Sequence, residues 1–357
     1  MHILHVVGAR PNFMKCAPLL RALRQFSQVR QTLVHTGQHY DAAMSDVFFR
    51  QLAMPPPDVN LAVGSASQAQ QTAEVMLRFE PVLLERNPEW VVVYGDVNST
   101  VAAALVACKL GIRVAHVEAG LRSRDRTMPE EINRVLTDQV SDLLFTPSAD
   151  ADDNLRREGI ETQRIHRVGN VMIDTLVRLI PQAAMPSEFA NAGRFVLATL
   201  HRPANVDDLP WLREMLATLT EVSRDAQVLF PVHPRTAKRL TEANAAPITN
   251  GRLRLLPPLS YLEFLALQQN AQVVVTDSGG IQEETSYLGV PCLTVRENTE
   301  RPITLTEGTN TLVGRDIPRL RQELERLLAQ PRGTPRQIPL WDGHAAERIA
   351  QILAQPS

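Results

Sequence analysis

Short runs of valine, isoleucine and leucine recur along the whole chain, and longer amphipathic segments separate them. These runs do not alternate polar and apolar residues as a strand with one solvent face would, so each strand is expected to be buried on both faces. Strands of this kind that alternate with helices form a parallel sheet with a helical layer on each side. The sequence therefore predicts an α/β protein.

The alternation begins again after residue 170. Expected strands of the first half are His2–Val7, Thr32–Thr36, Trp90–Tyr94, Val114–Val117 and Leu143–Thr146. Those of the second half are Phe195–Thr199, Gln227–Pro231, Leu253–Leu256, Gln272–Thr276 and Cys292–Val295. Amphipathic helices are expected between the strands, including Met14–Phe26, Ala42–Leu52, Ile281–Leu288 and Ala345–Ala354.

A chain of 357 residues exceeds what one hydrophobic core usually serves, which favours two domains. A hinge is expected near 170–193, because Ile180–Gly193 carries two prolines and little strand character. We expect one doubly wound domain at 1–170 and another at 171–342. Doubly wound domains bind ligands at the carboxyl ends of their strands, so the cleft between the domains is the expected site.

The charge and composition of the chain limit the classes of molecule that it is expected to bind. The formal net charge is −2 and no basic stripe is present, which disfavours duplex nucleic acid as a partner. No stretch reaches the roughly 20 apolar residues that span a bilayer, and the N-terminal run reads as a strand rather than a signal peptide. The three cysteines lie far apart in no metal-type spacing, which favours reduced thiols, a cytoplasmic location and no metal.

The segment Val273–Glu284 joins a buried strand to a helix through Ser278, Gly279 and Gly280. Paired glycines let backbone N–H groups approach an anion, and the helix N-terminus adds partial positive charge. This suits a diphosphate, and Glu284, one helical turn further on, suits a ribose diol. An ordinary tight turn with a capping carboxylate is the alternative.

The first strand also ends in a glycine turn before a helix that begins at a proline. Arg10 lies in that turn, where a guanidinium can bind phosphate in a bidentate manner. Lys15 falls in the first helical turn, which disfavours a cation unless an anion lies near. A solvated basic pair at a helix start is the alternative.

Three acidic side chains are placed to act as acids or bases. Asp96 and Glu118 each follow an apolar strand, at the edge where this architecture carries its active sites. Glu130 opens a helix, and Arg134 lies four residues after it. On local evidence alone, helix capping explains Asp96 slightly better than a catalytic role does, and a surface ion pair is the alternative for Glu130 with Arg134.

Further polar residues follow strands of both halves. His201 and His233 are candidate contacts to phosphate or sugar, although a loop histidine without such a role is the commoner case. The remaining candidates for sugar or second-ligand contacts are Gln38, His39, Arg202, Glu300 and Arg301.

Together these segments resemble the non-hydrolysing UDP-N-acetylglucosamine 2-epimerase family. The matching segments, in order, are Gly8–Pro11, Gln38–His39, Gly95–Asp96, His116–Arg122, Pro129–Glu131 with Asn133–Arg134, Gly169–Asn170, His201–Arg202, Pro231–His233, Thr276–Glu284 and Thr299–Pro302. They span nearly the whole chain, and the motifs containing His116 and Ser278 are together highly specific.

The resemblance implies a GT-B fold of two Rossmann-like domains, with a terminal helix at 343–357 returning to the first. It also implies a homodimer, a UDP-sugar substrate, no metal and no cofactor. Asp96, Glu118, Glu130 and His201 match residues needed for catalysis in that family. Nucleotide-binding positions are matched by Arg10, Ser278, Gly279, Gly280 and Glu284, and we add Lys15, Arg134 and His201 to this set. Asn12 stands where the family often has glutamate, and Gln70 replaces an arginine of the activator site that some members have.

The family's reaction breaks the C1–O bond first, which makes the C2 proton acidic, and then returns UDP to the 2-acetamidoglucal. We expect Asp96 to serve as a base. The rival hypotheses are a hydrolysing epimerase, an epimerase of a modified UDP-N-acetylhexosamine, a GT-B glycosyltransferase and a UDP-sugar sensor that does no chemistry. Analysis of the reaction products separates the first three hypotheses. A sensor would instead tolerate loss of Asp96, Glu118 and Glu130.

Overall fold

A computed structural model gives the fold, and it describes residues 1–38, 49, 51–242, 252–332 and 337–355. The chain forms two compact units. Unit 1 contains Met1–Thr175 and Pro339–Ser357, and unit 2 contains Leu176–Ile338. The expected helix Ala42–Leu52 lies largely outside the described residues.

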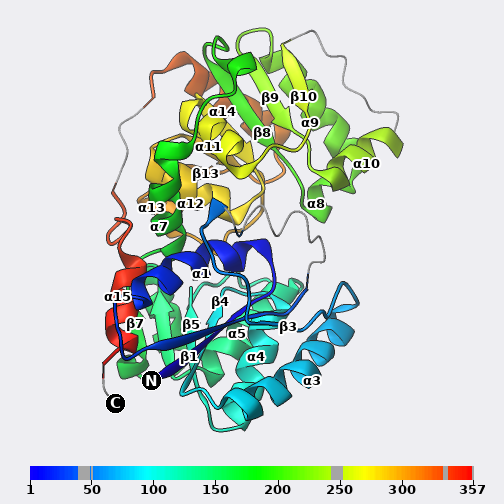
Figure 1. Cartoon of the computed structure of the whole chain (residues 1–357). Helices are drawn as coiled ribbons and strands as arrows, with labels where there is room; N and C mark the ends of the chain where they lie inside the picture. Colours follow the sequence, from blue (N-terminus) through cyan, green and yellow to red (C-terminus); the bar gives the residue numbers. More distant parts are fainter. Residues whose placement is uncertain (39–48, 50, 243–251, 333–336, 356–357) are drawn as a thin grey trace. The chain divides into compact units, whose positions relative to one another are not determined.

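Unit 1 is built on a parallel sheet in the order β3-β2-β1-β4-β5-β6-β7 (Figure 1). Its strands are β1 (His2–Val7), β2 (Arg30–His35), β3 (Val59–Asn60), β4 (Trp90–Tyr94), β5 (Arg113–Val117), β6 (Leu143–Thr146) and β7 (Ile165–Arg167). The central strands β1 and β4 are buried along their whole length, as their uninterrupted apolar sequences predict.

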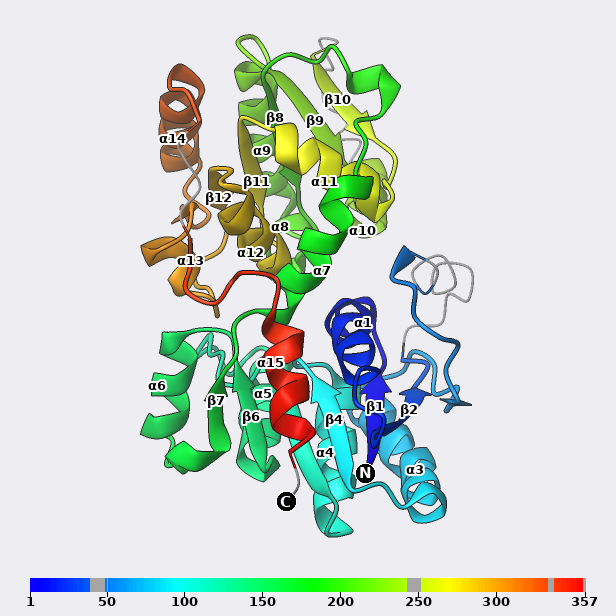
Figure 2. The same ribbon diagram turned by 60° about the vertical axis from the view of Figure 1, so that its left-hand side comes forward.

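Helices cover both faces of this sheet. They are α1 (Arg10–Leu23), α3 (Gln68–Arg86), α4 (Asn98–Lys109), α5 (Pro129–Val140), α6 (Ala149–Arg157), the first part of α7 (Val171–Leu179) and α15 (Ala345–Leu353). Figure 2 shows α1 beside α15, while α4 contacts both α3 and α5 in a second layer. Each crossover returns the chain to the same end of the sheet, so the loops after β1, β4 and β5 gather at one edge.

The N-terminus of α15 is held by a carboxylate. Asp174 accepts hydrogen bonds from the backbone N–H groups of Ala345 (3.1 Å) and Ala346 (2.6 Å). Just before the helix, the indole N–H of Trp341 donates to the Pro147 carbonyl at 2.9 Å. Burial raises the pKa of the Asp174 carboxyl to about 6, although both N–H groups favour its ionised form.

Unit 2 repeats the architecture with a parallel sheet in the order β10-β9-β8-β11-β12-β13. The strands are β8 (Phe195–Thr199), β9 (Gln227–Pro231), β10 (Leu253–Leu256), β11 (Val273–Thr276), β12 (Cys292–Thr294) and β13 (Asn310–Leu312). The helices are α8 (Pro203–Val206), α9 (Leu209–Val222), α10 (Pro234–Glu242), α11 (Tyr261–Asn270), α12 (Gly279–Leu288), α13 (Ile303–Thr306) and α14 (Ile317–Ala329). Both units are therefore Rossmann-like, which confirms the expected fold class.

Several elements were not expected from the sequence. The strands β3, β7 and β13 have only two or three residues, too few to show a period. Helix α7, which begins at Val171 and lies inside the segment 170–193 where a hinge is expected, is a further such element, and its Ile173 and Leu176 are fully buried. The two units part within this helix, after Thr175. Among the described residues, no helix is long and apolar enough to cross a membrane.

Candidate active site

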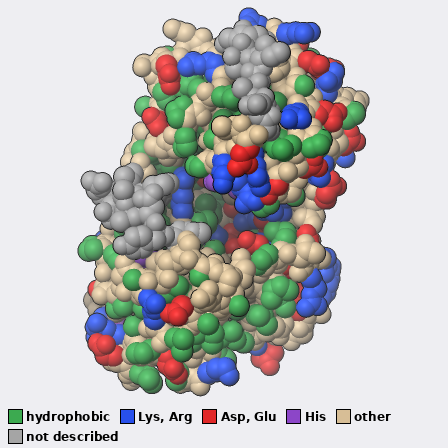
Figure 3. Space-filling model, turned by 90° about the vertical axis from the view of Figure 1, so that its right-hand side faces the viewer, with side chains coloured by type: hydrophobic (Ala, Val, Ile, Leu, Met, Phe, Trp, Pro, Cys, Tyr) green, Lys and Arg blue, Asp and Glu red, His purple; other side chains and the backbone are tan. Residues whose placement is uncertain are grey.

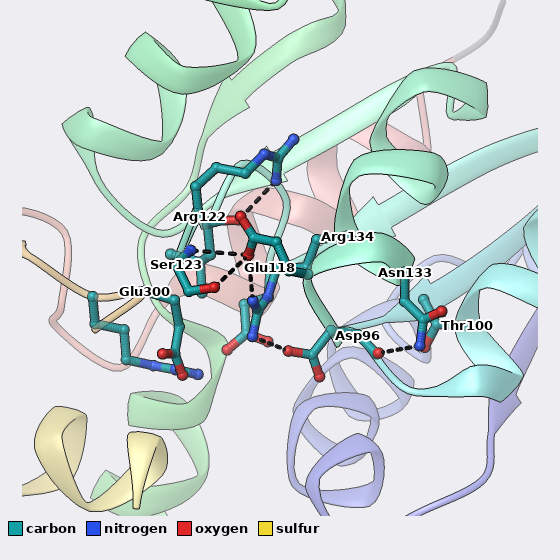
Figure 4. A network of polar contacts seen from close by, with 12 residues as sticks. Asp96, Thr100, Glu118, Arg122, Ser123, Asn133, Arg134 and Glu300 are labelled. Carbon is teal, nitrogen blue, oxygen red and sulfur yellow. Dashed lines mark hydrogen bonds and ion pairs between the residues drawn. The ribbon is translucent and has the colours of Figure 1, made fainter. Parts of the chain in front are cut away.

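The turn after β4 carries Asp96, and two neighbouring residues of α5 hold it. The Asp96 carboxylate lies 2.5 Å from the guanidinium of Arg134, and its backbone carbonyl accepts a 2.8 Å hydrogen bond from the Asn133 amide (Figure 4). The Asp96 side chain keeps 23% of its surface exposed, while that of Arg134 keeps 4%. Asp96 is thus an oriented carboxylate with one accessible side, which suits an acid or base better than a simple helix cap.

Glu130 and Glu131 take different roles although they are adjacent. Glu131 is buried, and its carboxylate accepts from the backbone N–H groups of Ser123 and Arg124 at 2.9 and 2.8 Å and from Arg134 at 2.7 Å. Burial alone would raise its pKa, but these hydrogen bonds bring the pKa of Glu131 below its ordinary value. Glu130 is exposed at the start of α5. Glu131 is therefore the acid that organises the loop, and Glu130 is the one open to solvent.

Glu118 follows β5 with a backbone φ of +74°, a conformation that a residue with a side chain adopts only at a cost of about 1–3 kcal/mol. Its backbone N–H and that of Ala119 both donate to the Phe145 carbonyl, which holds this conformation. The carboxylate forms an ion pair with Lys15 of α1, and both side chains are about 95% buried. Lys15, expected to contact nucleotide, is thus the partner of a candidate acid.

Gly95 allows these groups to meet. Its φ of +63° is left-handed, and a Cβ placed there would come within 2.7 Å of Lys15 Nζ and 3.1 Å of Glu118 Oε2. Any side chain would therefore both strain the turn and push the ion pair aside. The turns after β4 and β5 accordingly bring Asp96 and Glu118 to the same edge of the sheet.

Arg10 begins α1 and is exposed. The loop before it is shaped by Asn12, whose side-chain oxygen accepts from the N–H groups of Gly8 and Ala9, both at 3.1 Å. The same amide donates to the Tyr94 carbonyl at 2.7 Å, which a glutamate could not do when ionised. The asparagine that departs from the family pattern thus links the turns after β1 and β4.

Gln38 lies inside unit 1. Its side-chain oxygen accepts from the hydroxyl of Ser99 at 2.7 Å, and its backbone carbonyl accepts from Gln71 at 3.2 Å. It is buried, so in this conformation it supports the loop. His39, its expected partner, lies outside the described residues.

In unit 2, Asp277 organises the loops after β8 and β11. Its carboxylate accepts from the backbone N–H groups of His201 (3.1 Å) and Arg202 (2.9 Å) and from the Asn205 amide (3.1 Å). It also faces Nδ1 of His201 at 2.8 Å. Burial alone would raise its pKa, yet the contacts with His201, Arg202 and Asn205 bring the pKa of Asp277 below its ordinary value. The ionised carboxylate thereby fixes His201 and leaves 39% of its side chain exposed.

His233, after β9, lies beside His201 with a distance of 5.7 Å between ring centroids. Burial, and then the charge of His201, lower the pKa of His233. Arg202 donates through Nε to the backbone carbonyl of Asp277 at 2.9 Å. The structure therefore gathers His201, Arg202 and His233 at one end of the second sheet.

Ser278 precedes α12, and its backbone N–H donates to Thr276 Oγ1 at 3.0 Å. Its side chain makes no cap hydrogen bond to the helix N-terminus. A Cβ at Gly280 would meet nothing within 4 Å, so the backbone there is open to a ligand. A Cβ at Gly279 would come within 2.7 Å of the Glu300 and Arg301 side chains. The turn thus combines a helix N-terminus with unobstructed backbone, the expected arrangement for an anion.

Glu284 lies in the second turn of α12 and is buried. Its Oε1 accepts a 2.7 Å hydrogen bond from the hydroxyl of Tyr261, the first residue of α11. The tyrosine fixes the orientation of the carboxylate. No sequence pattern indicated this partner, which lies 23 residues away.

Glu300 and Arg301 belong to an internal network of ion pairs. Glu300 lies 2.7 Å from Arg296 and is also paired with Arg301, which in turn lies 2.7 Å from Glu283. All of these side chains are less than 10% exposed. Glu300 and Arg301 therefore pack under the glycine turn, where they support Gly279.

Sequence reasoning missed two functional candidates, Asp138 and Asp277. Both are fully buried carboxylates: Asp138 binds the loop after β5 in unit 1, and Asp277 binds the loop after β8 in unit 2. Asp277 stood in the quoted motif directly before Ser278, and its position at a strand end was an available signal. Asp138 lies in the last turn of α5, and acidic side chains on a helix usually face solvent, so only its burial marks it.

Residues 21–354 match the family model described as UDP-N-acetylglucosamine 2-epimerase. The UDP-N-acetylglucosamine 2-epimerase of Methanocaldococcus jannaschii is 43% identical over 99% of both chains. The UDP-2,3-diacetamido-2,3-dideoxy-D-glucuronate 2-epimerase of Pseudomonas aeruginosa is 41% identical over 99% of this chain and 100% of its own.

A solved structure is similar over the same length. The crystal structure of the M. jannaschii enzyme in complex with UDP-GlcNAc and UDP has a TM-score of 0.89 and 42% sequence identity, covering 99% of both chains. Similarity at this level extends over both Rossmann-like units rather than over one of them.

Proposed function

The chain belongs to the UDP-N-acetylglucosamine 2-epimerase family, and from that premise we propose that it interconverts UDP-N-acetylglucosamine and UDP-N-acetylmannosamine without net hydrolysis. The observation that carries this proposal is the pair of held carboxylates, Asp96 and Glu118, at one sheet edge of unit 1. A module that only bound a nucleotide sugar would have no use for the strained backbone at Glu118.

The reaction proceeds by elimination and readdition. The C1–O bond to UDP breaks, and the resulting positive character at C1 makes the C2 proton acidic. A carboxylate removes this proton and leaves 2-acetamidoglucal with UDP. Return of UDP to C1, together with protonation of C2 from the opposite face, gives the epimer.

We assign the proton transfers to unit 1. Asp96 is the base in this proposal, because Arg134 and Asn133 orient a carboxylate that remains accessible. Glu118 and Glu130 are the candidates for the opposite face. Lys15 pairs with the Glu118 carboxylate and so fixes its orientation. A positioned base or acid contributes about 10²–10⁴-fold.

We assign the departing diphosphate to the Ser278–Gly280 turn, assisted by His201 and by Arg10. The backbone at Gly280 is open, and the α12 N-terminus carries partial positive charge. One such donor is worth roughly 3 kcal/mol of barrier. Glu284 is assigned to the ribose hydroxyls, with Tyr261 holding it in place.

The test is NMR of UDP-N-acetylglucosamine with the purified protein in D₂O. We expect UDP-N-acetylmannosamine to form, and both sugars to gain deuterium at C2. Release of free N-acetylmannosamine with UDP would instead identify a hydrolysing enzyme. A new glycoside, formed only when an acceptor is added, would identify a glycosyltransferase.

Glu284→Ala is expected to weaken UDP binding by about 10- to 100-fold, the loss that follows when a hydrogen bond to a charged group is removed. Isothermal titration with UDP measures this. Tyr261→Phe is the matched variant, because it keeps the carboxylate and removes only the hydroxyl that orients it. Its effect should be smaller. Unchanged affinity in Glu284→Ala would remove Glu284 from the nucleotide site.

A modified sugar is the second candidate substrate. The 41% identity to the P. aeruginosa epimerase of a diacetamido uronic acid differs little from the 43% identity to the M. jannaschii enzyme. Comparison of kcat/KM for UDP-N-acetylglucosamine and for the 2,3-diacetamido uronic acid nucleotide decides between them. A higher value for the latter would make it the substrate.

We further propose that the protein is a homodimer in the cytoplasm. Leu77 and Leu84 lie two turns apart on α3 and are each 66% exposed, and Leu136 of α5 is 44% exposed. Hydrophobic side chains gather on the face of unit 1 that carries α3 (Figure 3). Sedimentation equilibrium should give twice the 39.7 kDa chain mass, and Leu77→Asp with Leu84→Asp should halve it. A monomeric native protein would contradict the proposal.

A further inference from the structure

His116, in β5, is completely buried and uses both ring nitrogens. Nδ1 lies 2.6 Å from Oδ1 of Asp138, and Nε2 lies 2.8 Å from the backbone carbonyl oxygen of Gly95. Asp138 is also completely buried. Neither residue has a role in the proton transfers assigned above.

These contacts determine where the protons lie. A backbone carbonyl only accepts, so Nε2 of His116 must donate to Gly95. Asp138 also accepts from the Gly120 N–H at 3.1 Å and lies 2.7 Å from the Arg122 guanidinium. Burial alone would raise its pKa, but the charges and hydrogen bonds of His116 and Arg122 bring the pKa of Asp138 below its ordinary value. The Gly120 N–H and the Arg122 guanidinium both act as donors to Asp138, so its oxygens are acceptors and Nδ1 of His116 is assigned as the donor to Oδ1.

His116 is accordingly an imidazolium in a chain of alternating charges. Arg122, on the far side of Asp138, also binds Glu158 through two hydrogen bonds of 2.8 and 2.6 Å. Buried charges persist only where each is paired and hydrogen-bonded, as here. The chain of charges ends on an uncharged group, the Gly95 carbonyl.

The Gly95 peptide leads directly into Asp96. The Gly95 N–H donates to the Val117 carbonyl at 2.9 Å, and its carbonyl accepts from His116, so two adjacent residues of β5 hold both polar groups of Gly95. Glycine at φ +63° has no side chain to restrict this turn, which makes these hydrogen bonds its main constraint. Asp138 in addition holds Gly120, in the loop that follows Glu118.

We propose that His116 is a positioning residue, a fixed imidazolium between Asp138 and the Gly95 carbonyl that aims the Asp96 carboxylate at the substrate. This inference rests on the proposed function, in which Asp96 is the base. His116 itself touches no substrate and takes up no proton during the reaction. Displacement of a reacting group by about 1 Å costs about 10²-fold in rate, so loss of this hydrogen bond should be seen in kcat.

Two variants separate positioning from stability. His116→Gln places an amide nitrogen near the former Nε2 and can still donate to Gly95, whereas His116→Asn places it near the former Nδ1 and can donate only to Asp138. Each variant loses one of two buried hydrogen bonds and the charge, so their melting temperatures should fall similarly. The deuterium exchange at C2 of UDP-N-acetylglucosamine then reports the position of Asp96.

We expect kcat for exchange to fall about 10²-fold in His116→Asn, with little change in KM, and clearly less in His116→Gln. Equal losses of kcat in both variants, or losses that follow the melting temperatures, would overturn the positioning role. ¹⁵N NMR of the wild-type histidines is a second measurement that needs no variant. Both ring nitrogens of His116 are expected to carry a proton in this spectrum, because each faces an acceptor, and a neutral ring would overturn the proposal.

Failure of the proposed function would look different. In that case the native protein would exchange no deuterium into UDP-N-acetylglucosamine, whatever the ¹⁵N spectrum shows. If the native protein is active and the two variants lose equal activity, only the positioning role of His116 is overturned.

Discussion

Asp96→Asn is expected to abolish deuterium exchange at C2 of UDP-N-acetylglucosamine, with kcat reduced by about 10²–10⁴-fold. The amide has nearly the same shape and keeps an oxygen for Arg134, which lies 2.5 Å away in the native protein. What it loses is the ability to accept the C2 proton. KM should change little, because the proposed diphosphate contacts belong to the Ser278–Gly280 turn.

The control for this experiment is Asp153→Asn. Asp153 lies on α6 of the same unit, is 55% exposed, and pairs only with Arg156 of the same helix in the contacts described. The Asp153→Asn substitution removes a negative charge from the same unit without changing the candidate site, so turnover should stay at the native rate. If Asp96→Asn exchanges deuterium at C2 at the native rate, another group is the base, and Glu118 would be tested next.

Lys15→Met is expected to lower the free energy of unfolding by about 3–5 kcal/mol, because it leaves the Glu118 carboxylate buried without its cation. Both side chains are about 95% buried in the native protein. Urea unfolding followed by circular dichroism and tryptophan fluorescence measures the change. The variant should also lose activity, because the Glu118 carboxylate loses the partner that holds it in place.

The double variant Lys15→Met with Glu118→Gln tests the cause. An uncharged amide no longer needs the cation, so much of the lost stability should return even though one more native group has been removed. Recovery of activity is not expected, because the carboxylate is gone. Additive losses in the double variant would show that the two side chains are not coupled.

The sequence anticipated where the candidate residues would lie, because strand ends can be read from it. Asp96 and Glu118 each follow a mainly apolar run, and they do lie at strand ends: Asp96 two residues after β4 and Glu118 directly after β5. Ser278 likewise precedes α12. In a parallel sheet all such positions fall at one edge, so the pattern of apolar runs was enough to place them.

The sequence could not identify the partners of these residues. Lys15 and Glu118 are 103 positions apart, and Tyr261 and Glu284 are 23 apart. Spacing shows only neighbours within one helix or strand, as when it suggested a pair between Glu130 and Arg134. Arg134 is in fact buried and bonded to Glu131 and Asp96, while Glu130 is exposed.

What the sequence alone determined is the α/β class, the parallel sheets and the set of motifs at strand ends, because periodicity and strand ends are local properties of the chain. What only the tertiary structure decided is which acidic and basic groups are buried together: Glu131 rather than Glu130, Lys15 with Glu118, and His116 between Asp138 and Gly95. The charge state and direction of a side chain follow from its burial and its partners. Both are set when distant segments pack, and so they leave no local pattern in the sequence.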